Sequence, residues 1–228
     1  MLLPPFPGFS DDGLQFLRDL KANNDREWFK PRKDTFDDEV KWPLMCLISD
    51  VSARAQSEGL TLQGDPKNNV FRIYRDTRFS KNKAPYKTHA SCYLSATGDK
   101  KAHGGVYVHV EPGSCFLASG MWSPDKDLLR AIRTRLAVHP DQADALMSDL
   151  AAAGLTLDPS DTLKRMPRGM EEHAESDHAD LIKLKSFTVS RGVADADVQA
   201  PAFTDAVLAF AHDVQPLTDF HSVVSASI

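Results

Sequence analysis

The sequence has few cysteines, no long apolar run and no overall excess of positive charge, and each absence excludes a class of protein. Its three cysteines, Cys46, Cys92 and Cys115, have neither metal-site nor redox spacing, which predicts reduced thiols. No stretch approaches the roughly 18 apolar residues of a membrane span. The N-terminus is broken by prolines and lacks the basic region of a signal peptide. We therefore expect a cytoplasmic protein without a membrane partner.

Motifs for nucleotide binding and for several kinds of hydrolysis are also missing. There is no P-loop, no dinucleotide glycine fingerprint, no Gly-x-Ser-x-Gly and no His-Glu-x-x-His. His173 and His178 lie among acidic residues, but with the spacing of neither a helical zinc site nor a calcium loop. This segment predicts a solvated acidic loop, so we expect no metal there. The sequence names no metal site and leaves any cofactor unknown.

The composition is that of a soluble globular protein. The chain has 228 residues, of which 42% are hydrophobic and 26% charged. It is long for one domain but short for two of typical size, and it has no convincing linker. We therefore expect residues 1–228 to form a single domain.

Two kinds of apolar periodicity divide the chain. Alternation with a period of two predicts strands over 71–76, 90–95 and 106–111, with further strands at 115–119 and 186–190. Helical spacing predicts three N-terminal helices, over 10–21, from about 26 to 42 and over 44–59, the last two separated by Pro43. It predicts three more in the second half of the chain, one that begins at Ser123-Pro124 and ends near 136, one over 141–153 and one over 203–217. Residues 158–180 are expected to be irregular. The expected fold class is α+β, a two-layer arrangement of helices on one face of a mainly antiparallel sheet.

The charge is unevenly distributed along the chain. The formal net charge is -5, yet residues 67–101 hold nine Lys or Arg against two Asp, a local charge of +7. From residue 140 onward there are fifteen acidic residues against six basic ones. A basic segment on an acidic body fits a small anionic ligand better than duplex nucleic acid. The alternative is that the basic segment pairs with the acidic C-terminal third.

Residues 72–87, which we call the basic loop, hold six cations in sixteen positions. Arginine suits carboxylate or phosphate, lysine adds a point charge, and long ordered loops are often functional. Asp76 is expected to hold one arginine in place, and Tyr86 to form a wall. The predicted ligand-binding residues are Arg72, Arg75, Asp76, Arg78, Lys81, Lys83, Tyr86 and Lys87. The prediction requires Arg72, Arg75, Lys83 and His109 to converge on one concavity.

Polar side chains also gather on one face of the expected sheet, opposite the valines. Among them, His89 and His109 have side chains that titrate near neutral pH, and Glu111 is placed to orient His109. These three residues are the candidates for catalytic acid–base chemistry. The alternative is an ordinary solvated sheet face, where such residues are common.

Several short segments form a recognisable signature: Asn24, Glu27-Trp28-Phe29, residues 72–76 (Arg-Ile-Tyr-Arg-Asp), residues 78–81 (Arg-Phe-Ser-Lys) and residues 85–87 (Pro-Tyr-Lys). On these residues the sequence resembles an uncharacterised family, the domain of unknown function number twenty-four sixty-one. The resemblance runs from about Phe9 to Phe210. It implies a single domain and assigns no activity, substrate or catalytic residue.

The sequence thus favours a protein that binds a small phosphate- or carboxylate-bearing ligand at the basic loop, beside the polar sheet face. A nucleic-acid-binding protein is the first alternative, and the acidic net charge disfavours it. A protein-interaction module using the same loop is the second. Whether the protein is an enzyme and how it oligomerises are left open.

Overall fold

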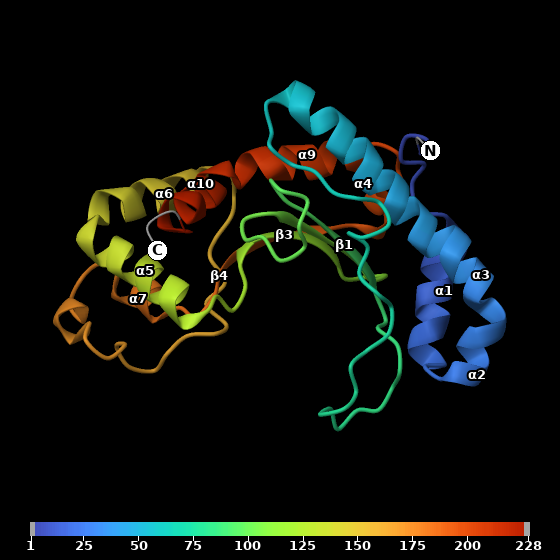
Figure 1. Ribbon diagram of the computed structural model, residues 1–228, viewed down its shortest axis with the longest axis horizontal. Helices are drawn as coiled ribbons and strands as arrows, with labels where there is room; N and C mark the ends of the chain where they lie inside the picture. Colours follow the sequence, from blue (N-terminus) through green and yellow to red (C-terminus); the bar gives the residue numbers. More distant parts are fainter. Residues whose placement is uncertain (1–2, 226–228) are drawn as a thin grey trace. The chain divides into compact units, whose positions relative to one another are not determined.

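The computed structural model describes residues 3–225, and these divide into two compact units (Figure 1). Unit 1 comprises residues 3–102, 106–117 and 192–210, and unit 2 comprises residues 103–105, 118–191 and 211–225. All the candidate site residues lie in unit 1. That residues 1–228 act as a single domain stays a prediction.

The sheet has four antiparallel strands in the order β1-β2-β3-β4, which confirms the expected α+β class. The strands are β1 (Ala90–Leu94), β2 (Val106–Val110), β3 (Cys115–Met121) and β4 (Phe187–Val193). The valines of β2 are buried, as their alternation predicts. The opposite face is not simply solvated, because Ser91 is 2% and His109 8% exposed. The alternative of a solvated sheet face is therefore wrong at these two positions.

The strand expected over 71–76 is absent, and an extended segment with two isolated bridges takes its place. Val70 bridges Cys92 in β1, but Tyr74 bridges Tyr86 instead. The segment leaves the edge of β1 and folds back on residues 85–87, where Pro85 has no amide hydrogen with which to continue a ladder. Residues 71–89 therefore form a long loop that projects beyond the strands (Figure 1).

The N-terminal helices follow the prediction, with breaks at the prolines. Helix α1 (Asp11–Ala22) begins at Ser10, whose Oγ accepts from the amide of Gly13. The next elements are α2 (Arg26–Phe29), a 3-10 turn at 30–32, α3 (Lys33–Phe36), a π-helical turn at 37–41 and α4 (Trp42–Ala55). The π turn ends at Lys41, two residues before Pro43, which has no amide to donate to the preceding turn. A 3-10 turn at 56–58 follows, and α4 packs against β1.

Unit 2 contains α5 (Lys126–Val138), α6 (Pro140–Ala152) and α7 (Ala179–Lys183). The expected start of α5 at Ser123 is wrong: its N-cap is Asp125, whose carboxylate accepts two amide hydrogen bonds. Residues 158–180 were expected to be irregular; they are mostly so, with a 3-10 turn at 171–173, but α7 already begins at Ala179.

The C-terminal helical region is divided rather than continuous. A short helix, α8 (Asp195–Val198), precedes α9 (Phe203–Asp213) and α10 (Gln215–Ser225). The break after Asp213 fits Pro216, which has no amide to donate to the preceding turn. The predicted apolar stripe is buried through both α9 and α10, although the sequence predicted one helix.

Candidate functional site

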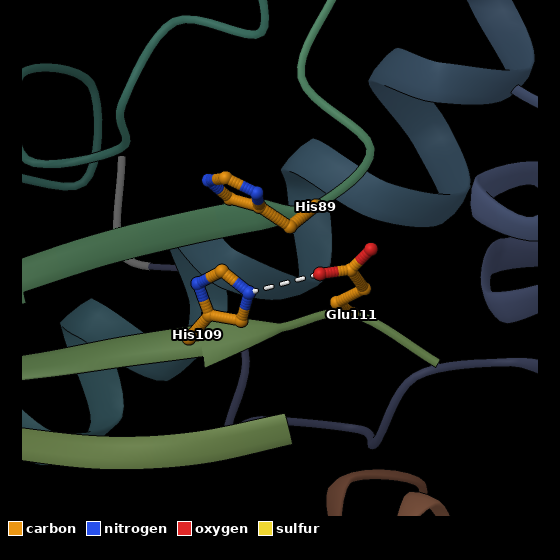
Figure 2. Close-up of side chains that lie close together, drawn as sticks. All are labelled: His89, His109 and Glu111. Atoms are coloured by element: carbon orange, nitrogen blue, oxygen red, sulfur yellow. Dashed lines mark ion pairs between the residues drawn. The ribbon is translucent and has the colours of Figure 1, made fainter. Parts of the chain in front are cut away.

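His89, His109 and Glu111 lie close together at one end of the β1–β2 pair (Figure 2). His109 is in β2, Glu111 follows its last residue, and His89 precedes β1. Ala90 pairs with Val110, so the antiparallel register brings His89 opposite Glu111. A ligand atom from each side chain lies within 4.8 Å of the others. The three predicted acid–base candidates therefore form one cluster.

His109 is held by contacts on several sides. Its Nδ1 lies 3.1 Å from the Tyr107 hydroxyl, and its Nε2 lies 3.6 Å from Glu111 Oε2. The ring stacks on Phe116 with centroids 4.4 Å apart, and the His89 ring lies 4.1 Å away on centroids. Burial lowers the pKa of His109, and Glu111 only partly offsets this. Both the burial and the lowered pKa favour the neutral imidazole of His109.

Glu111 is a carboxylate with defined partners on one oxygen. Its Oε1 accepts hydrogen bonds from Lys21 Nζ at 3.1 Å and from Thr88 Oγ1 at 3.0 Å. Burial acts to raise the pKa of Glu111, but these hydrogen bonds outweigh it and hold the pKa below its usual value. Burial and the neighbouring His109 lower the pKa of His89 to about 4. At neutral pH the cluster thus holds two neutral imidazoles and one carboxylate.

A cavity of about 360 Å³ borders this cluster, and we call it the basic cavity. Its lining includes three cations, Lys21, Arg75 and Lys87, together with His89. The other lining residues are Asn24, Asn82, Ala84, Tyr86 and Thr88. Burial lowers the pKa of Lys87, and two neighbouring cations that do not line the cavity, Arg72 and Lys100, lower it further.

The wall of the basic cavity is fixed by backbone hydrogen bonds. Asn24 donates to the carbonyl of Tyr86 and accepts from its amide, both at 3.0 Å. Tyr86 is buried and stacks on Phe29 with centroids 4.1 Å apart, and its pKa is raised by burial. Arg75 donates to the carbonyl of Ala84 at 3.2 Å. These contacts join the turn after α1 to the basic loop.

The structure separates other cations of the basic loop from this cavity. Lys83 lines a neighbouring cavity of about 550 Å³ and donates to the carbonyl of Thr77. Arg78 forms a two-pronged pair with Asp76 at 2.7 and 3.0 Å, so Asp76 does hold one arginine. Both side chains are exposed, so the pair adds little stability. Lys81 is exposed as well.

The convergence that the sequence prediction requires does not occur, because the four residues named for it do not line one cavity. Of the four residues named for it, only Arg75 lines the basic cavity; Lys83 lines its neighbour, and Arg72 and His109 line neither. Arg75, Tyr86 and Lys87 are the predicted ligand-binding residues that lie together, and the candidate base His89 joins them.

Two residues of the site escaped the sequence reasoning. Lys21 and Asn24 lie in or just after α1, far along the chain from the basic loop. Nothing in the spacing of Asn24 indicates its hydrogen bonds to Tyr86. Tyr107 in β2 is also outside the predicted set, although its hydroxyl contacts His109.

The acidic segment near residue 175 does not form a comparable cluster. His173 lies 3.5 Å from Glu172, whereas His178 lies 3.5 Å from Asp144 in α6. Across residues 3–225, the one group of three side chains placed to share a metal ion is His89, His109 and Glu111.

Comparison with known proteins places the chain in a family. Within residues 3–225, no helix is both long and apolar enough to cross a membrane. Neither the curated proteins nor the solved structures include a match to this sequence. A family model described as "conserved hypothetical protein (DUF2461)" matches residues 12–220, which include both the cluster and the basic cavity. The chain therefore belongs to the DUF2461 family, as the similar segments in its sequence predict.

Proposed function

We propose that the protein binds a small phosphate- or carboxylate-bearing ligand in the basic cavity. The observation that carries the proposal is the meeting of Lys21, Arg75 and Lys87 around one space of about 360 Å³. Its size falls within the range of small-molecule sites, roughly 300–1,000 Å³. Arginine offers a planar pair of donors, and the lysines add charge that need not be precisely oriented.

The charge balance of the cavity supports an anion. Lys21 is partly neutralised by Glu111, at 3.1 Å. Lys87 is half-buried among other cations, and this lowers its pKa. A bound anion would favour the charged form of Lys87 and offset the effects of burial and of the neighbouring cations Arg72 and Lys100.

The cavity also favours a small ligand over a polymer. Nucleic-acid binders track the phosphate backbone with a continuous basic surface, and their affinity falls steeply with salt. Here the cations of the loop divide between two cavities and an internal pair. Arg78 and Lys83 have partners within the loop itself, so part of their hydrogen-bonding capacity is already used.

The test is calorimetric titration at pH 7.5 with phosphate, sugar phosphates, nucleotides, dicarboxylates and short oligonucleotides. Arg75→Ala is the test variant. Lys81→Ala is the matched control, because it removes one charge from the same loop outside the cavity. We expect Arg75→Ala to raise the Kd for a small anion about tenfold or more, the loss of one charge-assisted hydrogen bond. Lys81→Ala should leave the Kd nearly unchanged.

Three outcomes would overturn the proposal. The first is that no small anion binds. The second is an equal loss of affinity in Arg75→Ala and Lys81→Ala, which would show diffuse attraction rather than a site. The third is binding of oligonucleotides alone, with affinity that grows with length, which would favour the nucleic-acid alternative.

A further inference from the structure

We propose that His89, His109 and Glu111 bind a divalent first-row transition-metal ion, with zinc as the reference case. The site would use one nitrogen of each imidazole and Oε2 of the carboxylate. Two histidines and one carboxylate form a donor set that zinc and ferrous iron both accept. The inference does not rest on anion binding, since the three side chains come together without the lysines or arginines of the basic cavity.

The distances between the three side chains fit ligands of one metal ion better than direct hydrogen bonds. His109 Nε2 and Glu111 Oε2 are 3.6 Å apart, longer than an ordinary hydrogen bond. On a tetrahedral zinc ion with bonds of about 2.1 Å, two ligand atoms lie about 3.4 Å apart, and no pair can exceed about 4.2 Å. The three ligand atoms now lie within 4.8 Å of one another. Closing the remaining gap requires the half-buried His89 ring to turn, because it now lies over the His109 ring with centroids 4.1 Å apart.

Neighbouring residues already orient two of the three ligands. With a metal on Nε2 of His109, the Nδ1–H donates to the Tyr107 hydroxyl, 3.1 Å away, and Phe116 holds the ring plane. Lys21 and Thr88 both donate to Oε1 of Glu111, which leaves Oε2 for the ion. Support of this kind, a hydrogen bond on the other nitrogen and partners on the carboxylate, accompanies metal ligands in proteins.

The ring nitrogens of the third ligand, His89, are available to bind a metal ion. Among residues 3–225 its ring makes no hydrogen bond through either nitrogen, although it stacks against His109. Figure 2 shows its ring above that of His109, with Glu111 beside both. Nitrogen ligands disfavour magnesium and calcium, which prefer oxygen. Three protein ligands also leave at least one position on a tetrahedral ion for water or an anion.

The test is a titration of the full chain, first stripped of metal with a chelator, with Zn²⁺ and Co²⁺ against a chromophoric competitor. We expect one equivalent to bind, with Co²⁺ absorption bands of a nitrogen- and oxygen-ligated site, and no competition from Mg²⁺. Glu111→Gln retains acceptors for Lys21 and Thr88 but removes the anionic ligand. This variant and His109→Ala should each lower affinity by at least about tenfold.

The control is His173→Ala, which removes a histidine that also lies beside a carboxylate. It should leave metal affinity unchanged. Because His109→Ala alters a buried strand, His89→Ala provides a second ligand variant outside β1, with folding checked by circular dichroism. The proposal is overturned if metal does not bind, if binding survives in Glu111→Gln and His89→Ala, or if His173→Ala weakens it equally.

Discussion

Acidification should destabilise the protein through His221, a buried histidine of α10 in unit 2. This side chain is 2% exposed, and neither ring nitrogen has a hydrogen-bond partner among residues 3–225. Burial and the nearby His103 lower the pKa of His221 from 6.5 to about 3. Well above pH 6.5 the ring is neutral in both the folded and the unfolded chain, so it makes no pH-dependent contribution. Below pH 6.5 the unfolded chain binds the proton first, and stability falls until the pH nears 3.

The size of this effect at pH 5 hardly depends on how low the folded pKa lies. At pH 5 the unfolded ring is almost fully protonated and the folded ring almost neutral. The free energy of unfolding should therefore fall by about 2 kcal/mol between pH 7.5 and pH 5 on account of His221 alone. His221→Leu removes the titrating group and the two unpartnered nitrogens. We expect the variant to be at least as stable as the wild type at pH 7.5. Its advantage in the free energy of unfolding should grow by about 2 kcal/mol at pH 5.

Urea unfolding followed by circular dichroism, at pH 7.5, 6 and 5 with a chelator present, measures this difference. His139→Gln is the control, because His139 is exposed. Its loss of stability on acidification should parallel that of the wild type. If His221→Leu also parallels the wild type, the buried ring takes up its proton without unfolding, and the reasoning from burial is refuted.

Three further substitutions test the structure around the site and the sheet. Asn24→Ala removes both hydrogen bonds to Tyr86, so it should lower the free energy of unfolding in urea by about 2 kcal/mol and weaken anion binding. Asn24→Asp keeps the acceptor and should lose less stability. Gly120→Ala should cost about 2 kcal/mol or more, since φ is +122° and a Cβ would lie 2.1 Å from the Phe187 carbonyl oxygen; an unchanged melting temperature would contradict this. Phe79→Ser should change stability by less than about 0.5 kcal/mol, because Phe79 is 95% exposed.

Local patterns predicted most of the secondary structure because the relevant forces act over a few residues. Alternating valines placed β2, and Ser10 placed the start of α1. The errors arose where a distant contact decides the outcome. Ser123 looked like an N-cap, yet it adopts φ +47° and its amide donates to Ser186 Oγ, sixty-three residues away. Asp125 caps α5 instead.

The cluster could be predicted only in part, because the sequence does not fix how β1 and β2 align with each other. The period of two places His109 and Glu111 on the same face of β2, and this follows from the sequence alone. The placement of His89 opposite Glu111 depends on how β1 and β2 align across the intervening loop. A shift of one residue would turn His89 to the other face. No signal in that loop fixes the alignment.

The basic cavity was harder still, because the sequence shows charge density but not which charges meet. Six cations in the basic loop suggested one site, whereas the structure divides them. The cation that joins Arg75 and Lys87 is Lys21, from α1, and it is positioned by Glu111 rather than by the loop. Only the tertiary fold connects these segments.

The two proposed sites are adjacent: His89 belongs to both, and Lys21 lines the basic cavity while it binds Glu111. Binding at one site is therefore expected to change the affinity of the other. A divalent ion on Glu111 would lie near Lys21, whose Nζ is 3.1 Å from the same carboxylate, and near Lys87. That repulsion would weaken metal binding in the ligand-free protein, and an anion in the basic cavity would offset it. Linkage then requires each ligand to raise the affinity of the other by the same factor. Metal titrations with and without a bound anion should show this gain, and Arg75→Ala should reduce it while leaving the three metal ligands in place.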